Sequence, residues 1–357
     1  MRYIRFLKTP RVVNEKGTSR SQISCLITVT SDLGDSFLPS DVQLSAELLS
    51  SNPREEVLVW RTVQWTAGMR SLAITFPLIK SRTSPSLRVK VGIEPKSKHD
   101  TFDVLCDKRS CGIVSAWSCE FNPLPSFQDV EKLVERRFCI QDNRMINIFE
   151  ETGESIARHL WDAGITLSCH IDRLLDLKNQ IEKTKISSSQ PSSLQVLELG
   201  TGCGMVGISL ATIVPGANVL LTDLAEAREI VERNIRESRL AKGANVTFQE
   251  LDWDEEMPST IKEKSSPLDM VVAADCTYNS DSSPALVNTL QRLAEISPQV
   301  QVAIAMKMRH SSEEVFFDLM AEAGFHEVAK LDFPLPGDVE VGEEVVYLHA
   351  YQYNPST

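Results

Sequence analysis

Three glycines follow one apolar segment of the chain, in the stretch VLELGTGCGMVG. Gly200, Gly202 and Gly204 lie between a predicted strand that contains Glu198 and a helix predicted to begin near Met205. Glycine permits unusual backbone angles and lets a ligand come close to the main chain. The stretch therefore predicts a ligand-binding loop at the end of a strand.

Carboxylates mark the ends of the next two predicted strands. Asp223 follows NVLLT, where a carboxylate can accept hydrogen bonds from both hydroxyl groups of a ribose. The following strand ends in ELDWDEE, in which Asp252 could bond an adenine amino group and Trp253 could stack on the ring. The alternative for Trp253 is a rim aromatic that covers the edge of the sheet. These residues predict a nucleoside site without choosing the cofactor.

A fourth apolar segment ends in a carboxylate and a phenol three residues apart, in VVAADCTYN. Asp275 could attract and orient a cation, and Tyr278 could offer its ring face or its hydroxyl oxygen. The alternatives are a carboxylate that caps the following helix and a packed aromatic ring. The basic run KMRH, from Lys307 to His310, follows the next strand and could also contact a substrate.

Alternating strands and helices are expected to position these residues. The predicted strands are LQVLELG, ANVLLTD, ANVTFQEL, LDMVVAAD, VQVAIAMK, HEVAKLDF and EVVYLHAYQY. Helical segments such as AEAREIVERNIRESRLA lie between the earlier strands, so the pattern predicts βαβ units and a parallel sheet. Open α/β sheets bind ligands at the carboxyl edge of their strands. Before the first strand, a long helix is predicted from about residue 150, because apolar residues share one face.

The chain of 357 residues exceeds the usual size of one domain. Short, partly alternating segments separated by turn-forming residues predict a mostly-β accessory domain, a sandwich or barrel, over residues 1–125. We expect a connection over residues 126–149 and an α/β domain over residues 150–357. The first region contains no recognisable catalytic constellation.

The net charge of −12 is shared unevenly along the chain. Residues 1–140 carry a net charge of +5 and residues 141–357 carry −17. The acidic part is either merely hydrophilic or attracts a basic substrate through its summed field. Phosphate contacts need clustered Lys and Arg, so we expect no direct binding of nucleic acid.

The eight cysteines are scattered, without a CxxC pair and without a His at zinc-site spacing. This distribution predicts reduced thiols in a cytoplasmic protein, also compatible with the nucleus, and no metal site. No signal peptide and no run of about 18 apolar residues is found, so we expect no membrane partner.

The glycine loop can be interpreted in two ways. Gly202, Gly204 and Gly207 satisfy G-x-G-x-x-G, which would favour an NAD-dependent oxidoreductase. The dinucleotide form, however, places its first glycine directly at the strand end, where this chain has Gly200. The frame E-x-G-x-G-x-G, with Glu198 inside the strand, instead resembles motif I of class I S-adenosylmethionine-dependent methyltransferases.

Three further pieces narrow this resemblance: HLWDAG before motif I, NVLLTDL with VERNI around Asp223, and AADCTYN after the fourth strand. In this order, over about residues 145–353, they look like family 16 of the seven-strand methyltransferases, which carry a D-x-x-Y motif. Most members methylate lysine side chains of other proteins. The resemblance implies a Rossmann-like seven-strand methyltransferase sheet, S-adenosyl-L-methionine as cofactor and S-adenosyl-L-homocysteine as product.

The resemblance also implies roles for individual residues. Asp275 and Tyr278 would face the incoming amine, with Asp275 orienting the target ammonium and Tyr278 shaping its channel. The cofactor carries the reactivity, and the protein must align a neutral amine although free lysine, with a pKa of about 10.4, arrives protonated. The residues implied in cofactor binding are Trp161, Glu198, Gly200, Thr201, Gly202, Gly204, Asp223, Leu224, Asp252, Trp253 and Ala274.

The resemblance implies a protein substrate that bears the target lysine, and we expect the chain itself to be a monomer. Substrate choice depends on loops around the site, so a protein N-terminus, another side chain or a small-molecule amine stays open as the acceptor. A non-catalytic binding module, in which the basic β region recognises a partner, is a further alternative. The complete set of motif residues argues against that loss of activity.

Overall fold

The computed structural model describes residues 1–14, 21–51, 54–78, 86–123, 131–151, 156–183, 193–263, 266–336 and 344–354, and divides the chain into two compact units. The first unit comprises Met1–Phe138 and Asn147–Ser155, and the second comprises Cys139–Ile146 and Ile156–Thr357. Each unit is described by itself below. None of the helices in the described part of the chain is long and apolar enough to span a membrane.

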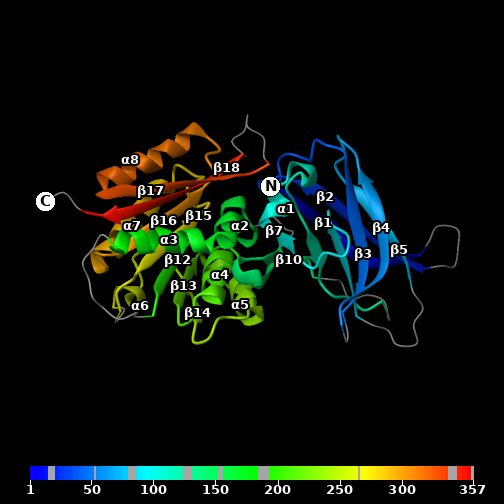
Figure 1. The fold of residues 1–357 in the computed structure, drawn as a ribbon, viewed down its shortest axis with the longest axis horizontal. Coiled ribbons are helices and arrows are strands. Elements are labelled where there is room, and N and C mark those ends of the chain that lie inside the picture. The colour runs from blue at the N-terminus through cyan, green and yellow to red at the C-terminus, as the bar shows by residue number, and fades with distance from the viewer. Residues whose placement is uncertain are drawn as a thin grey trace. The chain divides into compact units, whose positions relative to one another are not determined.

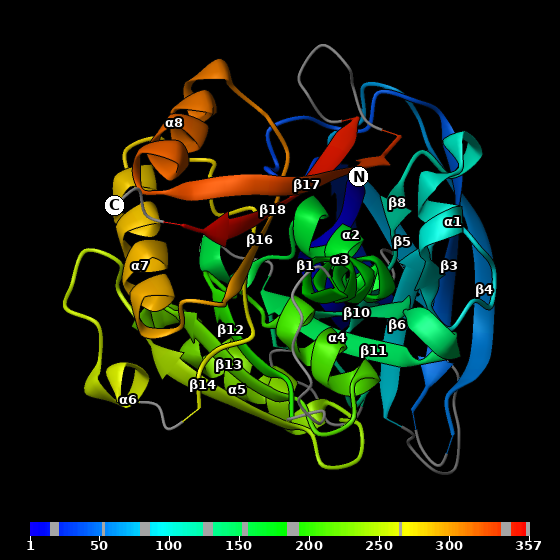
Figure 2. The same cartoon turned by 60° about the vertical axis from the view of Figure 1, so that its left-hand side comes forward.

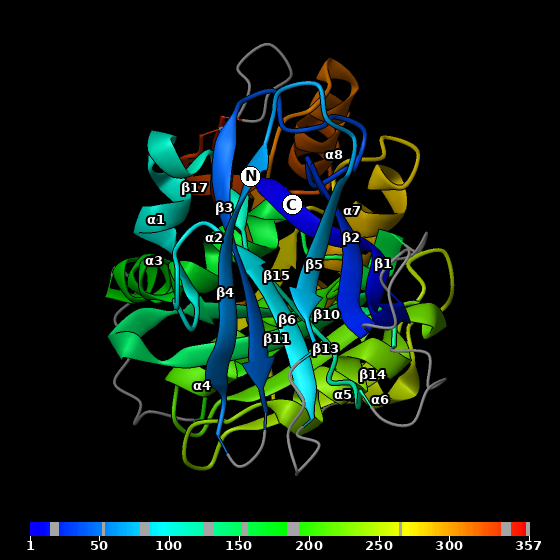
Figure 3. The ribbon, with the colours of Figure 1, turned by 90° about the vertical axis from the view of Figure 1, so that its right-hand side faces the viewer.

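The first unit is built from two sheets (Figures 1 and 3). One sheet has the order β5-β2-β1-β8, with β1 at Arg2–Asn14, β2 at Ser21–Thr30, β5 at Leu72–Pro77 and β8 at Ile113–Val114. The other has the order β11-β10-β9-β6-β3-β4, with β3 at Val42–Ser50, β4 at Glu56–Trp65, β6 at Leu87–Gly92, β9 at Ala116–Ser118, β10 at Leu133–Cys139 and β11 at Met145–Glu151. The short strand β7 (Asp100–Thr101) pairs with β10, and helix α1 (Phe102–Cys106) follows it.

Alternating apolar residues of both sheets form one buried cluster in this unit. Strand β2 contributes Ile23 and Ile27, β3 contributes Leu44 and Leu48, and β5 contributes Phe76. The predicted mostly-β character is therefore confirmed, with a sandwich rather than a barrel. The strands β1 and β11 were not anticipated, whereas β10 lies where the connection was expected to run into a short helix or strand. The charged residues of β10 and β11 hide their alternation.

Charged side chains are buried among these strands and are paired. Arg136 on β10 and Glu150 on β11 are almost fully buried and form an ion pair. The Arg136 guanidinium also donates to the carbonyl oxygens of Ile4 (2.8 Å), Val114 (3.2 Å) and Ser115 (2.9 Å). The pair therefore connects backbone from both sheets, and removal of either charge breaks a buried ion pair.

We predict that Arg136→Met destabilises the full chain by about 3–5 kcal/mol, because Glu150 would be left buried without its partner. The control is Arg109→Met, which removes a solvent-exposed pair with Asp107 and should leave the unfolding midpoint unchanged. Urea unfolding of both variants and the wild type measures the difference. Equal midpoints for all three proteins would contradict the assigned role.

The second unit contains a sheet of seven strands in the order β14-β13-β12-β15-β16-β18-β17 (Figure 1). The first five are parallel, and β18 is antiparallel to both β16 and β17. Their bounds are Gln195–Leu199 (β12), Asn218–Asp223 (β13), Asn245–Glu250 (β14), Met270–Ala274 (β15), Gln301–Met306 (β16), Phe325–Pro334 (β17) and Val345–Tyr353 (β18). The predicted seven-strand, Rossmann-like sheet is confirmed.

Helices cover both faces of this sheet (Figure 2). On one face, α7 (Ser283–Ile296) and α8 (Val315–Glu322) contribute to a core with Leu197, Leu199 and Val271. On the other face, α4 (Met205–Ile213) lies directly on the sheet, since a Cβ at Gly207 would meet Leu221 at 2.4 Å. The remaining helices are α2 (Asp162–Cys169), α3 (Ile171–Lys183), α5 (Arg228–Glu237) and α6 (Ser259–Lys262).

The prediction of a single long helix before the sheet is wrong. The structure has a short 3-10 turn at Ile156–Arg158, then α2, then α3 after a break at His170. Trp161 is extended (φ −118°, ψ 153°) and therefore separates the turn from α2. The apolar spacing is helical throughout, but spacing does not show where a tertiary contact ends a helix.

Candidate functional site

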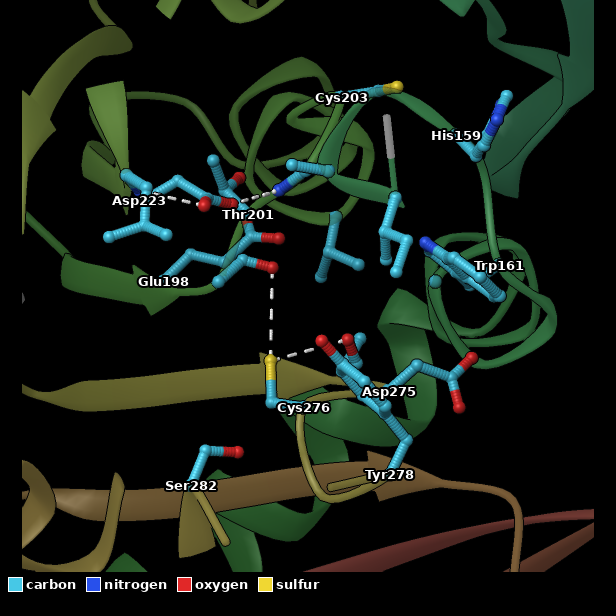
Figure 4. Close-up of a pocket in the computed structure, with 18 of the residues that line it drawn as sticks. His159, Trp161, Glu198, Thr201, Cys203, Asp223, Asp275, Cys276, Tyr278 and Ser282 are labelled. Carbon is cyan, nitrogen blue, oxygen red and sulfur yellow. Dashed lines mark hydrogen bonds between the residues drawn. The ribbon is translucent and has the colours of Figure 1, made fainter. Parts of the chain in front are cut away.

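A cavity of about 350 Å³ opens at the carboxyl edge of the parallel strands. Figure 4 shows Asp223 and Glu198 at one end of the view, and Asp275, Tyr278 and Trp161 at the other. Twelve of the thirteen predicted site residues line this cavity: Trp161, Glu198, Gly200, Thr201, Gly202, Asp223, Leu224, Asp252, Trp253, Ala274, Asp275 and Tyr278. Gly204 is not in the lining, and a Cβ there would meet Leu221 at 3.1 Å, so it packs beneath the loop.

Two positions of the loop require glycine. Gly200 and Gly202 have φ values of +58° and +56°, which favour glycine. At Gly200 a side chain would also collide, because a Cβ there would lie 2.6 Å from Cys276 Sγ and 3.3 Å from the Trp253 ring. Trp253 thus packs on the Gly200 backbone at the cavity wall, and a ligand can come close to the main chain at these glycines.

Carboxylates of the chain itself accept hydrogen bonds from amides at this loop and at the start of the following helix. Asp223 Oδ2 accepts from the Gly202 amide at 2.7 Å, and Glu198 Oε2 accepts from the Gly207 amide at 2.7 Å. Gly207 lies in the first turn of α4, where amides have no partner within the helix. A dinucleotide diphosphate would need such amides for itself. The loop is therefore better suited to a ligand without phosphate.

The lining is acidic. Its carboxylates belong to Glu198, Asp223, Glu226, Asp252, Asp254 and Asp275, and no Lys or Arg occurs among its described residues. A cavity with this lining favours cations and neutral groups over anions. This is a second argument against NAD, whose diphosphate carries negative charge. The described residues also contain no group of three or more His, Cys, Asp or Glu side chains placed to hold a metal ion.

Burial shifts the pKa of two of these acids. Burial raises the pKa of Glu198 to about 8, although the Gly207 amide opposes the shift. Burial also raises the pKa of Asp223, and the amides of Gly202 and Leu224 oppose it. Glu198 is therefore largely protonated at neutral pH.

Asp275 combines an unusual backbone with a fully engaged side chain. Its φ is +56°, a left-handed conformation that is uncommon outside glycine. Its Oδ2 accepts from the Ala163 amide at 2.8 Å, and its Oδ1 accepts from Arg309 Nη1 at 2.9 Å. Ala163 lies in the first turn of α2, so Asp275 caps that helix from another part of the chain, not the helix that follows it in sequence.

A second ion pair fixes the same helix end. Lys307 Nζ lies 2.8 Å from Asp162 Oδ2, and both side chains are buried. Asp162 is the first residue of α2, and Lys307 follows the end of β16. Two cations of the predicted basic run, Lys307 and Arg309, thus lie next to the start of α2. The sequence KMRH showed that positive charge follows the strand, but it did not show that Lys307 and Arg309 each pair with an aspartate.

Of the other residues in the motif after the fourth strand, Tyr278 is exposed and Cys276 is buried. Tyr278 is 51% exposed at the cavity and is free to meet an incoming group. Cys276 is buried, its thiol donates to the Leu199 carbonyl oxygen at 3.3 Å, and burial raises its pKa well above the usual value. Cys276 is therefore a protonated packing residue beneath Gly200.

The sequence did not reveal one wall of the cavity. Ile156, Ala157, His159 and Leu160 line it, from the segment that was predicted as helix. Arg158 in this segment donates from Nε to the Glu226 carbonyl oxygen at 2.8 Å. These residues are placed by the extended conformation around Trp161, for which no local signal exists in the sequence.

Comparison with known proteins identifies relatives of the chain. A family model described as lysine methyltransferase matches residues 140–323. The UPF0665 family protein C23C4.06c of Schizosaccharomyces pombe is 28% identical over 319 residues, which cover 88% of this chain and 91% of that protein. The protein-lysine N-methyltransferase EFM3 of Chaetomium thermophilum is 29% identical over 50% of this chain and 51% of its own length. The protein N-lysine methyltransferase METTL21A of Danio rerio is 30% identical over 45% and 65%. The chain therefore spans about half to two thirds of these two enzymes.

We predict that Glu198→Gln gains stability relative to the wild type as the pH rises from 5 to 9. The wild-type carboxyl has a folded-state pKa of about 8, above its ordinary value of 4.5, so the folded state binds more protons in this range. Its contribution to stability is complete at low pH and is lost as the pH rises through 8, whereas glutamine does not titrate. Urea unfolding at several pH values measures the difference.

The control for this series is Glu237→Gln, an exposed residue at the end of α5. Its stability relative to wild type should not change with pH over the same range. A difference between Glu198→Gln and wild type that stays constant from pH 5 to 9 would show that Glu198 is ionised throughout.

Proposed function

The chain belongs to the lysine methyltransferase family, and from this membership we propose that it transfers a methyl group from S-adenosylmethionine to a lysine side chain of another protein. The family suggested by the sequence motifs is thereby confirmed. The observation that carries the proposal is the acidic cavity at the carboxyl edge, which brings the glycine loop and the D-x-x-Y residues to one space. A cationic cofactor and a cationic substrate both suit that charge.

The residues present fit this cofactor. S-adenosylmethionine supplies a methyl group on positively charged sulfur. Asp223 would hold its ribose. Each of its carboxylate oxygens already accepts one hydrogen bond from a backbone amide and keeps a further lone pair for a ribose hydroxyl. Trp253 and Asp252 would contact the adenine, and Gly200 and Gly202 would allow close main-chain contact. Further contacts would come from Trp161, Glu198, Thr201, Leu224 and Ala274, whereas Gly204 supports the loop from below.

Asp275 and Tyr278 form the acceptor end in this proposal. Tyr278 is half-exposed and can guide the lysine side chain into the cavity through its ring face. Asp275 fixes the backbone that follows Ala274, and its carboxylate stays paired with Arg309 at the acceptor end. Alignment of the amine at close range can contribute several kcal/mol to the rate acceleration.

The proposed partner is a protein that carries the target lysine, without direct contact to nucleic acid or membrane. The cytoplasm is the proposed location, with the nucleus as a further one, because all eight cysteines are free thiols, as is usual in reducing compartments. We propose that the chain acts as a monomer.

We predict that the full chain binds S-adenosylhomocysteine and does not bind NAD, because the lining is acidic and the loop amides are occupied. Asp223→Asn should weaken binding at least about tenfold, since a charge-assisted hydrogen bond contributes about 1.5–3 kcal/mol. Isothermal titration measures both. Asp318→Asn, an exposed change on α8, is the control and should bind like wild type. Tight binding of NAD would overturn the cofactor assignment.

We further predict that purified chain and labelled S-adenosylmethionine introduce label into lysine of a protein in cell lysate. Mass spectrometry locates the labelled residue, and Gly200→Ala should abolish labelling because its Cβ would collide with Cys276. Gly216→Ala is the matched control, with a similar φ of +71° and open space around the Cβ. Label at a protein N-terminus or on another side chain would replace lysine as the acceptor.

A further inference from the structure

Arg309 lies behind the acceptor end of the cavity. Its Nη1 is 2.9 Å from Asp275 Oδ1, and the two side chains are 12% and 2% exposed. Its guanidinium carbon lies 5.9 Å from the centre of the Trp161 ring. Asp275 and Trp161 line the cavity, but Arg309 does not. The guanidinium therefore compensates the charge of Asp275 without entering the space that a substrate would use.

This compensation distinguishes Asp275 from the acids at the cofactor end. Glu198 and Asp223 accept hydrogen bonds from neutral amides, those of Gly207 and Gly202. Asp275 also accepts one hydrogen bond from an amide, but its second oxygen forms an ion pair with the Arg309 guanidinium. At the cofactor end, Asp223 thus accepts from neutral amides and Glu198 is largely protonated, whereas the carboxylate at the acceptor end is paired with a cation.

The difference matters for a lysine acceptor, and the inference rests on the lysine methylation proposed above. An ammonium has no lone pair, so the lysine must lose its proton before the nitrogen can form a bond to the methyl carbon. A bare buried carboxylate stabilises the ammonium and raises its pKa, whereas a neighbouring cation lowers it. A carboxylate whose charge is already compensated by a guanidinium neither raises nor lowers the pKa of the lysine strongly.

Other charged groups surround this pair from several elements. Lys307 and Asp162, at the end of β16 and the start of α2, form a buried ion pair. Glu313 accepts from the amides of Arg309 and His310, and burial raises its pKa. On the cavity side lie Tyr278 and the acids Glu198 and Asp223. These groups are common to all variants considered below.

We propose that Arg309 is a positioning residue that keeps the acceptor lysine neutral. It holds the Asp275 carboxylate against the start of α2 and cancels its charge, so that the bound ammonium releases its proton at a lower pH than beside Asp275 alone. The proton passes to water at the open rim, where Tyr278 is half-exposed.

The test is the pH profile of methyl transfer by full-length proteins: wild type, Arg309→Met, Asp275→Asn and the double variant, together with Arg309→Lys and one control variant. The probe is desalted cell lysate with labelled S-adenosylmethionine, and the product is methyllysine counted after acid hydrolysis. Lysate is used at concentrations that saturate the rate, so that the profile reports the bound amine.

Opposite shifts are expected from the two single variants. Arg309→Met leaves Asp275 uncompensated and should move the midpoint of the profile up by about one pH unit or more. Asp275→Asn leaves Arg309 uncompensated and should move it down. The double variant has neither charge and should return close to wild type, as should Arg309→Lys, which keeps the positive charge. The control is Arg292→Met, which removes a partly buried arginine of α7 that does not line the cavity.

The outcomes separate this inference from the proposed function. If wild type forms no methyllysine while it binds S-adenosylhomocysteine, the proposed function fails, and the role of Arg309 fails with it. If wild type is active but Arg309→Met loses rate equally at every pH, Arg309 is merely structural. Should Arg309→Met fail to bind S-adenosylhomocysteine, Asp275→Asn decides, and an unshifted profile in that variant overturns the proposal.

Discussion

The carboxyl edge of a parallel sheet leaves backbone amides in need of partners, and the chain meets this need with its own carboxylates. Asp223 and Glu198 bind amides of the glycine loop and of the first turn of α4. Asp275 does the same for α2, which follows no strand of the sheet. Helix N-termini favour negative charge, so all three acids also stabilise the helix dipoles or loops next to them. The acidity of the cavity is thus a consequence of how its walls are held.

This arrangement explains which ligands the edge can accept. In a dinucleotide fold the loop amides and the helix N-terminus are left for phosphate. In this chain, amides of the loop and of the first turn of α4 already donate to Asp223 and Glu198. A phosphate would therefore meet carboxylates instead of these amides. Protonation of Glu198 reduces the repulsion among the acids in the empty cavity, because its pKa of about 8 leaves it largely neutral. A cationic ligand would favour its ionised form, so the site can increase its negative charge when such a ligand binds.

Local features of this protein were readable from its sequence, and tertiary ones were not. The glycines, Asp223 and Asp275 were recognised because a strand end, a tight loop and a polar residue are adjacent in the chain. The break at Trp161 was missed, because α2 begins where Asp275, 112 residues away, supplies the cap. The pair of Lys307 with Asp162 joins residues 145 apart, and no periodicity encodes such a distance. Strand β11 was missed and β10 could not be told from a short helix for a similar reason, since their buried charges Glu150 and Arg136 look like surface residues until they are seen paired.

The choice of aspartate at position 275 illustrates how these constraints combine. The left-handed backbone there would be relaxed by glycine, and asparagine would tolerate it almost as well. Glycine, however, would leave Ala163 without a cap and Arg309 without a partner. Asparagine could still accept from the amide, but it would bring no charge to a buried guanidinium. Only a carboxylate satisfies the helix, the guanidinium and the turn together, and backbone strain persists where the surroundings determine it from several sides. Position 275 therefore joins the end of β15, the start of α2 and the loop after β16 at the acceptor end of the cavity.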